Sequence, residues 1–158
     1  MRIYLVDDRG QNGEYLAFIH AYRGQMPEYT MDVFTHWQPM FDAIIKNPPD
    51  LILADMRFDL VTREQLYGDI DALANSEHFG GNYERAEAQV RGMQGLLISR
   101  ALRDNHISVP IILFASLAPK VEQNVIQKLA PIRIIKGLIL EEILQAMREL
   151  VPEWMHGK

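Results

Sequence analysis

Cysteine is absent from this chain of 158 residues. A chain without cysteine forms no disulfide, offers no thiolate ligand to a metal and has no thiol nucleophile. Long apolar runs are also missing, since no stretch approaches the roughly 20 residues that span a bilayer. The N-terminus lacks the basic flank and apolar core of a signal peptide. We therefore expect a cytoplasmic protein with no membrane partner.

An excess of positive charge is missing as well. The formal net charge is -5, and no run of Lys or Arg stands out. A surface with this balance does not attract the phosphates of nucleic acid, so we expect no direct nucleic-acid partner. The remaining composition, 48% hydrophobic and 23% charged, is that of an ordinary globular protein. The length favours a single domain over residues 1–158.

Short apolar stretches alternate with amphipathic stretches along the chain. Strands are predicted over residues 2–7, 29–35, 50–55, 109–115 and 132–135. Helices are predicted over residues 14–24, 38–46 and 119–129. A final helix is predicted from the helical spacing of the apolar residues between Leu140 and Leu150. This alternation favours an α/β fold, a doubly wound parallel five-stranded sheet of the flavodoxin-like order 2-1-3-4-5.

Acidic residues stand where two of these strands end. Asp7 and Asp8 follow the first strand, and Asp55 closes the third. Ligands of doubly wound sheets bind outside the carboxyl ends of the strands, so we expect the three carboxylates in one pocket. Carboxylates this close repel one another unless a cation lies between them, and Mg²⁺ is the natural candidate. Asp7 and Asp8 could instead cap the turn into the first helix.

Several motifs, taken in order along the chain, resemble the response-regulator receiver domain of two-component signalling, the CheY-like superfamily. They are Val6-Asp7-Asp8, Leu53-Ala54-Asp55, Met93-Gln94-Gly95-Leu96-Leu97, Val109-Pro110-Ile111-Ile112-Leu113-Phe114 and Ile134-Ile135-Lys136. The resemblance covers most of the chain except for about residues 58–91. It identifies the chain as an atypical receiver domain with an insertion after the third strand.

The resemblance implies a set of roles for these residues. Asp55 would accept a phosphoryl group from a histidine kinase or a phosphotransfer protein, with Mg²⁺ held by Asp7, Asp8 and Asp55. The backbone carbonyl of Arg57 would complete the metal ligands, and Lys136 would pair with the phosphoryl oxygens. Phosphoryl transfer depends on positioning and charge neutralisation, so a metal and a cation flank the moving group. Such a domain signals and is not expected to be an enzyme.

The sequence departs from the receiver pattern at three positions. Ala115 occupies the place of the family's Ser or Thr at the end of the fourth strand, and Ser116 comes one residue later. Side chains alternate along a strand, so Ser116 would point elsewhere unless a bulge after Phe114 brings it to the site. Arg133 stands where an aromatic switch residue is usual, and Gly137 stands where proline follows the lysine.

The insertion, residues 58–91, reads as a helical hairpin. We predict one helix between Leu60 and Ala74, a turn at Gly80-Gly81-Asn82, and a second helix from Tyr83 that merges into the next, as far as Ala101. It could be a solvated decoration, an arm for partner docking or homodimer formation, or a lid over Asp55. Loops that are long for their connection are often functional.

Three functions follow from these observations. The first is a single-domain response regulator that signals to a downstream protein by contact. The second is a pseudo-receiver that signals without phosphate, which Ala115, Arg133 and the insertion favour. The third is a phosphatase of the haloacid-dehalogenase type, in which a second acid would stand at Arg57, so we regard it as the weakest.

Overall fold

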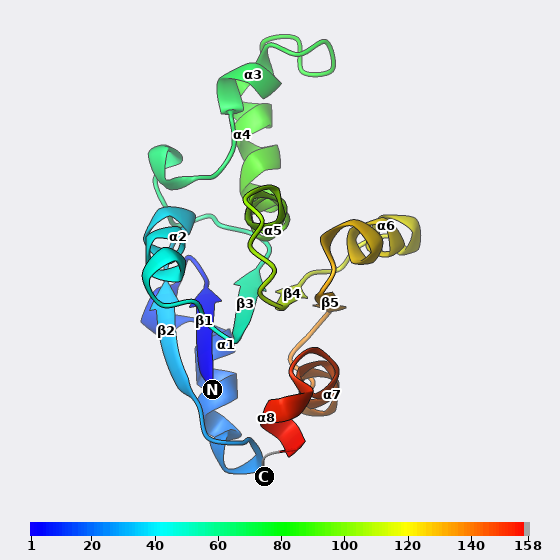
Figure 1. Cartoon of the computed structure of the whole chain (residues 1–158). Coiled ribbons are helices and arrows are strands. Elements are labelled where there is room, and N and C mark those ends of the chain that lie inside the picture. The colour runs from blue at the N-terminus through cyan, green and yellow to red at the C-terminus, as the bar shows by residue number, and fades with distance from the viewer. Residues whose placement is uncertain (157–158) are drawn as a thin grey trace.

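A computed structural model describes residues 1–156 of the chain (Figure 1). Five parallel strands form one sheet in the order β2-β1-β3-β4-β5. They are β1 (Arg2–Val6), β2 (Thr30–Phe34), β3 (Leu51–Asp55), β4 (Ile111–Phe114) and β5 (Ile132–Ile135). The predicted flavodoxin-like order is confirmed, and each strand lies within its predicted range.

Helices cover both faces of the sheet. One face is covered by α1 (Glu14–Ala21) and α7 (Leu140–Leu150). The other face is covered by α2 (Trp37–Lys46), α5 (Gln94–Asp104) and α6 (Pro119–Leu129). Because both faces are covered, the central strands bury almost every side chain, which explains their continuous apolar runs. Among residues 1–156, no helix is long and apolar enough to cross a membrane.

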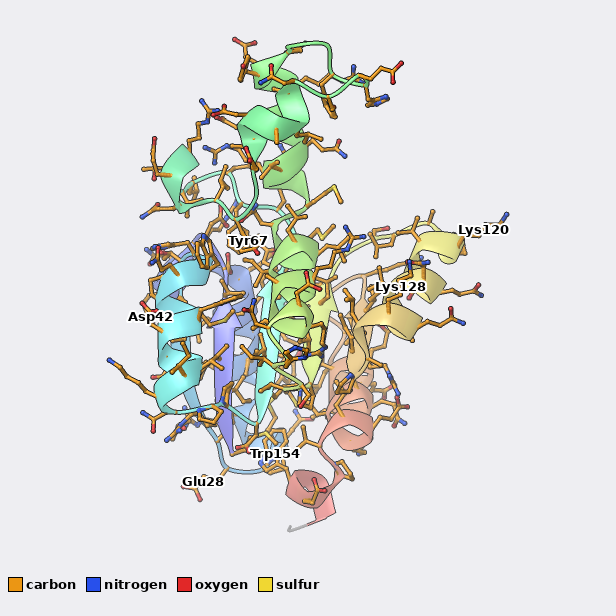
Figure 2. The ribbon with its side chains drawn as sticks, turned by 45° about the horizontal axis from the view of Figure 1, so that its top comes forward. Glu28, Asp42, Tyr67, Lys120, Lys128 and Trp154 are labelled. Atoms are coloured by element: carbon orange, nitrogen blue, oxygen red, sulfur yellow. The ribbon has the colours of Figure 1, made fainter. Side chains whose placement is uncertain are left out.

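Two elements at the amino edge of the sheet differ in detail from expectation. The helix predicted over residues 14–24 ends at Ala21, because the chain tightens into a 3-10 turn, η2 (Arg23–Gln25). A short helix, α8 (Pro152–His156), follows α7. The indole N–H of Trp154 donates a hydrogen bond of 3.1 Å to the carbonyl of Glu28, which ties α8 to the segment before β2 (Figure 2).

The insertion, residues 58–91 and called the arm below, rises beyond the carboxyl edge of the sheet (Figure 1). It holds η3 (Arg63–Gln65), α3 (Ile70–Ala74) and most of α4 (Tyr83–Gly92). The helix predicted from Leu60 to Ala74 is wrong over its first half. Gly68 has a φ of 123°, a backbone conformation that ends helical geometry. The predicted turn is confirmed by the positive φ of Gly80 and Gly81, and α3 packs against α4.

The merged helix predicted as far as Ala101 is also wrong, because the chain breaks between α4 and α5. Met93 at the break has a φ of -121° and a ψ of 12°. This break is caused by contacts with the end of β3 rather than by the local sequence. The Gly95 N–H donates a 3.0 Å hydrogen bond to the carbonyl of Met56, and a Cβ at Gly95 would come within 2.3 Å of the Asp55 carbonyl oxygen. The break therefore seats the start of α5 against the end of β3.

The arm is packed into the domain. Its buried apolar side chains, among them Phe58 and Val90, are contiguous with the core on the α2 and α5 face of the sheet. The Tyr67 ring packs edge-on against Trp37 at 5.1 Å between centroids, and it lies where the arm meets α2 (Figure 2). The buried Gln94 amide accepts from the Tyr67 N–H at 2.9 Å and donates to its carbonyl at 2.8 Å. The base of the arm is therefore fixed from two sides.

Candidate metal centre

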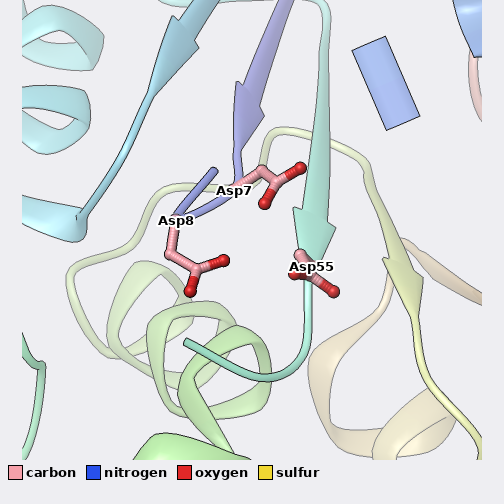
Figure 3. Close-up of side chains that lie close together, drawn as sticks. All are labelled: Asp7, Asp8 and Asp55. Carbon is pink, nitrogen blue, oxygen red and sulfur yellow. The ribbon is translucent and has the colours of Figure 1, made fainter. Parts of the chain in front are cut away.

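Three carboxylates meet at the carboxyl edge of the sheet. Asp7 and Asp8 follow β1 and Asp55 ends β3, and these strands are paired neighbours. One carboxylate oxygen from each residue lies within 4.8 Å of the other two (Figure 3). The parallel register that aligns Val6 with Ala54 brings these positions side by side. A cluster of this size can share one divalent cation.

Asp7 supplies a sign that the pocket is built for a cation. Its side chain is 1% exposed, and Oδ1 accepts a 3.1 Å hydrogen bond from the Arg9 N–H. Its Oδ2 is buried and has no hydrogen-bond partner among the described residues. Burying an unpaired carboxylate oxygen is costly, and native structures rarely leave one. A Cβ at Gly13 would come within 2.2 Å of this oxygen, so glycine alone leaves the carboxylate its place.

The alternative in which the acids cap the turn into the first helix is met only in part, because Asp7 Oδ1 accepts the Arg9 N–H of that turn. The N-cap residue of α1 is Gly13, and that of the preceding 3-10 turn, η1 (Gly10–Asn12), is Arg9. Neither helix start receives a side-chain cap hydrogen bond. Neither acid caps a helix start, and both Asp7 and Asp8 line the pocket.

Asp8 joins the pocket to the arm. Its Oδ2 accepts two backbone hydrogen bonds, from the Asp59 N–H at 2.7 Å and from the Leu60 N–H at 2.9 Å. The same segment is held from the other side by Arg91 of α4, whose Nη1 donates to the carbonyls of Phe58 and Val61. The first residues of the arm are thus clamped between one acid of the pocket and one helix of the arm.

The electrostatics of the pocket disfavour three bare negative charges. Burial, and then the charge of Asp7, raises the pKa of Asp55 to about 6, against opposing hydrogen bonds from the Tyr15 hydroxyl and the Met56 N–H. Burial also raises the pKa of Asp7, and the neighbouring Asp8 adds to this rise. A divalent cation would reverse both effects, because an adjacent positive charge favours the ionised carboxylate.

The acids line a hollow of about 280 Å³ together with groups from α1 and the arm. Arg57 lines it too, and its Nε pairs with Asp59 at 2.8 Å. Tyr15 lines it too, and sequence reasoning missed this residue. Its ring stacks on Phe114 with 4.5 Å between centroids and 26° between planes. The only signal in the sequence is that an aromatic residue follows soon after the acidic turn. The contact with Phe114 joins distant parts of the chain, so the sequence alone does not predict it.

Other predicted site residues lie outside this hollow. Lys136 follows β5, is exposed, and lines a separate hollow with Arg133 between α6 and α7. Ala115 is buried, and its N–H donates a 3.0 Å bond to the Ile135 carbonyl, which continues the ladder of β4. The bulge after Phe114 that would have turned Ser116 toward the acid pocket therefore does not form. Ser116 is exposed and is not among the residues that line the acid pocket.

A doubly wound sheet of this order, with acids after β1 and at the end of β3, has the architecture of response-regulator receiver domains. No family model and no curated protein matches the sequence. Solved structures match the fold. A LuxR-family DNA-binding response regulator from Staphylococcus aureus is 12% identical, with a TM-score of 0.58 and coverage of 94% of this chain and 97% of that chain.

Two further structures agree. The receiver domain of HemR from Leptospira biflexa is 14% identical, with a TM-score of 0.58 over 94% of this chain and 92% of that chain. The receiver domain of nitrogen regulatory protein C is 16% identical, with the same TM-score and the same coverage. The chain therefore has the fold of receiver domains, as the sequence motifs predicted.

Proposed function

We propose that this chain acts as the receiver domain of a response regulator of two-component signalling and accepts a phosphoryl group on Asp55. The observation that supports this best is the buried, unpartnered Oδ2 of Asp7, which lies in a cluster with Asp8 and Asp55. The receiver fold adds support, because its phosphoacceptor is expected where Asp55 stands. The protein acts as a phosphoacceptor signalling domain and not as an enzyme.

The donor set suits Mg²⁺, which takes oxygen ligands. Asp7, Asp8, Asp55 and the backbone carbonyl of Arg57 would hold it. When bound, Mg²⁺ offsets the repulsion between the carboxylates and an anionic phosphoryl group. The chain itself orients the nucleophile, since the Met56 N–H donates a 2.9 Å hydrogen bond to Oδ1 of Asp55.

The transfer step uses Asp55 as the nucleophile. A carboxylate oxygen attacks the phosphorus of a phosphohistidine on a histidine kinase or a phosphotransfer protein. The O–P bond forms as the P–N bond breaks, and the electron pair leaves with the imidazole nitrogen, which takes up a proton. The product is an acyl phosphate. Lys136 keeps the charge-pairing role that the resemblance implies, and its exposed side chain would have to turn from its own hollow to the phosphoryl oxygens.

The output of the domain is a contact with a downstream protein in the cytoplasm. The arm is the element that the pocket can influence most directly, because Asp8 binds the backbone of Asp59 and Leu60. A change in the ligands of Asp8 would alter these bonds and so the base of the arm. A homodimer, the other role considered for the arm, would also form through contacts of the arm.

A second candidate is a pseudo-receiver that signals without phosphate. Two observations favour it: Ala115 offers no hydroxyl, and Lys136 lies outside the acid pocket. The two candidates differ in one chemical event, the gain of a phosphoryl group on Asp55.

Intact mass measurement after incubation with acetyl phosphate and Mg²⁺ separates the two. We expect one added phosphoryl mass in the wild type, and none with EDTA or in Asp55→Asn. Asp42→Asn, an exposed acid on α2, is the matched control and should still be phosphorylated. A folded wild type that gains no mass would contradict the proposal and favour the pseudo-receiver. Steady turnover of phosphate esters would instead favour the phosphatase.

A further inference from the structure

The acid pocket is lined by a residue with a hydroxyl, Tyr15, that comes from α1 and not from the end of β4. By the resemblance, the hydroxyl that reads the phosphoryl group would stand at Ala115, and the nearest alternative, Ser116, is exposed. Tyr15, the second residue of α1, lines the pocket beside the three acids. A phosphoryl group is recognised by hydrogen-bond donors around its oxygens, so this hydroxyl has the right chemistry.

The ring of Tyr15 is held firmly beside Asp55. It stacks on Phe114, which is 3% exposed, with 4.5 Å between the ring centroids. Phe114 is the residue that pairs directly with Asp55 across β3 and β4. Offset stacked rings attract each other beyond the effect of burial alone. The stack therefore fixes the Tyr15 ring relative to the end of β3, and Tyr15 and Asp55 line the same hollow.

The Tyr15 phenol is a donor under ordinary conditions. The ordinary pKa of a tyrosine hydroxyl is about 10. The hydroxyl therefore keeps its proton through neutral pH and can donate it to an anionic oxygen. A hydrogen bond to an ionised acceptor is about twice as strong as one between neutral groups.

We propose that the Tyr15 hydroxyl donates a hydrogen bond to the phosphoryl group on Asp55. This contact takes over the recognition that a strand hydroxyl provides in other receiver domains. The inference rests on the proposed function of Asp55 as the phosphoacceptor. Because Tyr15 belongs to α1, the contact links the phosphoryl group to the α1 side of the sheet.

Beryllofluoride with Mg²⁺, a stable analogue of the phosphoryl group, tests this contact at equilibrium. Tyr15→Phe removes only the hydroxyl and keeps the ring that stacks on Phe114. We expect it to bind beryllofluoride roughly tenfold more weakly, the loss of one hydrogen bond to a charged group. The ¹⁹F spectrum of the bound analogue should also change, because one fluorine loses its donor. Tyr22→Phe, just beyond the other end of α1, is the matched control and should match the wild type.

Three results would decide against the inference. Equal affinity and an unchanged ¹⁹F spectrum in a folded Tyr15→Phe would overturn it. If Ser116→Ala binds beryllofluoride more weakly while Tyr15→Phe binds it as well as the wild type, the inference is also overturned. The hydroxyl that recognises the phosphoryl group would then be that of Ser116. A wild type that binds no beryllofluoride and gains no phosphoryl mass would overturn the proposed function, and the inference with it. Thermal melts followed by circular dichroism confirm that each variant is folded.

Discussion

At the scale of residues, Asp7 and Asp55 stand out because their burial makes a negative charge on them energetically costly. Asp7 is almost fully buried with an unpartnered oxygen, and burial raises the pKa of Asp55 to about 6. Two neighbouring groups that resist ionisation become good ligands when a cation arrives, because the cation stabilises their charged forms. The pocket is therefore under electrostatic strain without a cation, and this strain can be measured.

Asp55→Asn should stabilise the metal-free protein at high pH. The folded pKa of Asp55 is about 6, above its ordinary value of 3.8, so the folded state binds the proton more tightly than the unfolded state. The free energy of unfolding therefore falls as pH rises through this window and stays low above it. We expect the variant to be more stable than the wild type by about 1–2 kcal/mol at pH 8 and not at pH 4.

Urea unfolding in EDTA at the two pH values measures this difference. Exposed Asp42→Asn is the control and should show no such pH dependence. A stability gain of equal size at both pH values would mean that charge on Asp55 is not the cause.

Gly13→Ala should damage the metal site and leave the fold in place. The added Cβ would come within 2.2 Å of Oδ2 of Asp7, so the carboxylate must move. Overpacking a filled site costs about 1–3 kcal/mol, so we expect Mg²⁺ affinity to fall about tenfold. Gly24→Ala is the control, because its Cβ would meet nothing within 4 Å. Calorimetric titration with Mg²⁺ compares the variants, and equal affinity in all of them would place the cation away from Asp7.

At the scale of elements, the arm is held by a clamp that begins in the pocket. Asp8 binds the Asp59 and Leu60 N–H groups, and Arg91 binds the carbonyls on either side of them. Arg91 also pairs with Glu87 at 3.2 Å within α4. The polar contacts therefore run without interruption from a carboxylate of the pocket to the helix that forms one side of the arm.

Arg91→Met should loosen the base of the arm. It leaves the carbonyls of Phe58 and Val61 without their donor, and such losses cost about 1–3 kcal/mol. We expect faster hydrogen exchange at the Asp59 and Leu60 amides, measured by NMR, and a lower free energy of unfolding. Arg100→Met is the control, because Arg100 is exposed on α5 and should tolerate the change. Unchanged exchange at both amides would show that the Arg91 side chain does not hold the segment.

At the scale of the whole molecule, the parts that could be predicted are those encoded locally. Apolar runs are enough to place the strands, and the acids at the ends of two of them are enough to bring Asp7, Asp8 and Asp55 to one edge. The break at Met93 could not be predicted, because it depends on a hydrogen bond to the distant carbonyl of Met56. The place of Tyr15 depends likewise on stacking across the sheet.

Another miss has a local cause. Gly68 interrupts the first predicted helix of the arm through its positive φ, which a closer reading of that glycine could have suggested. Lys136 stands at the predicted strand end and lines the hollow between α6 and α7, while its pairing with the phosphoryl oxygens stays a prediction. The position in the chain follows from the strand pattern, whereas the direction of a long, exposed side chain does not.

The measurement that tests the metal centre most directly is a titration of the ¹⁵N-labelled protein with Mg²⁺, followed by its amide resonances. We predict saturable shifts that centre on the Arg9, Met56 and Asp59 amides, which donate to the three carboxylates. These shifts should be lost in Asp8→Asn. A folded wild type whose amides near the pocket do not respond to Mg²⁺ at any concentration would contradict the shared cation and the phosphoacceptor built on it.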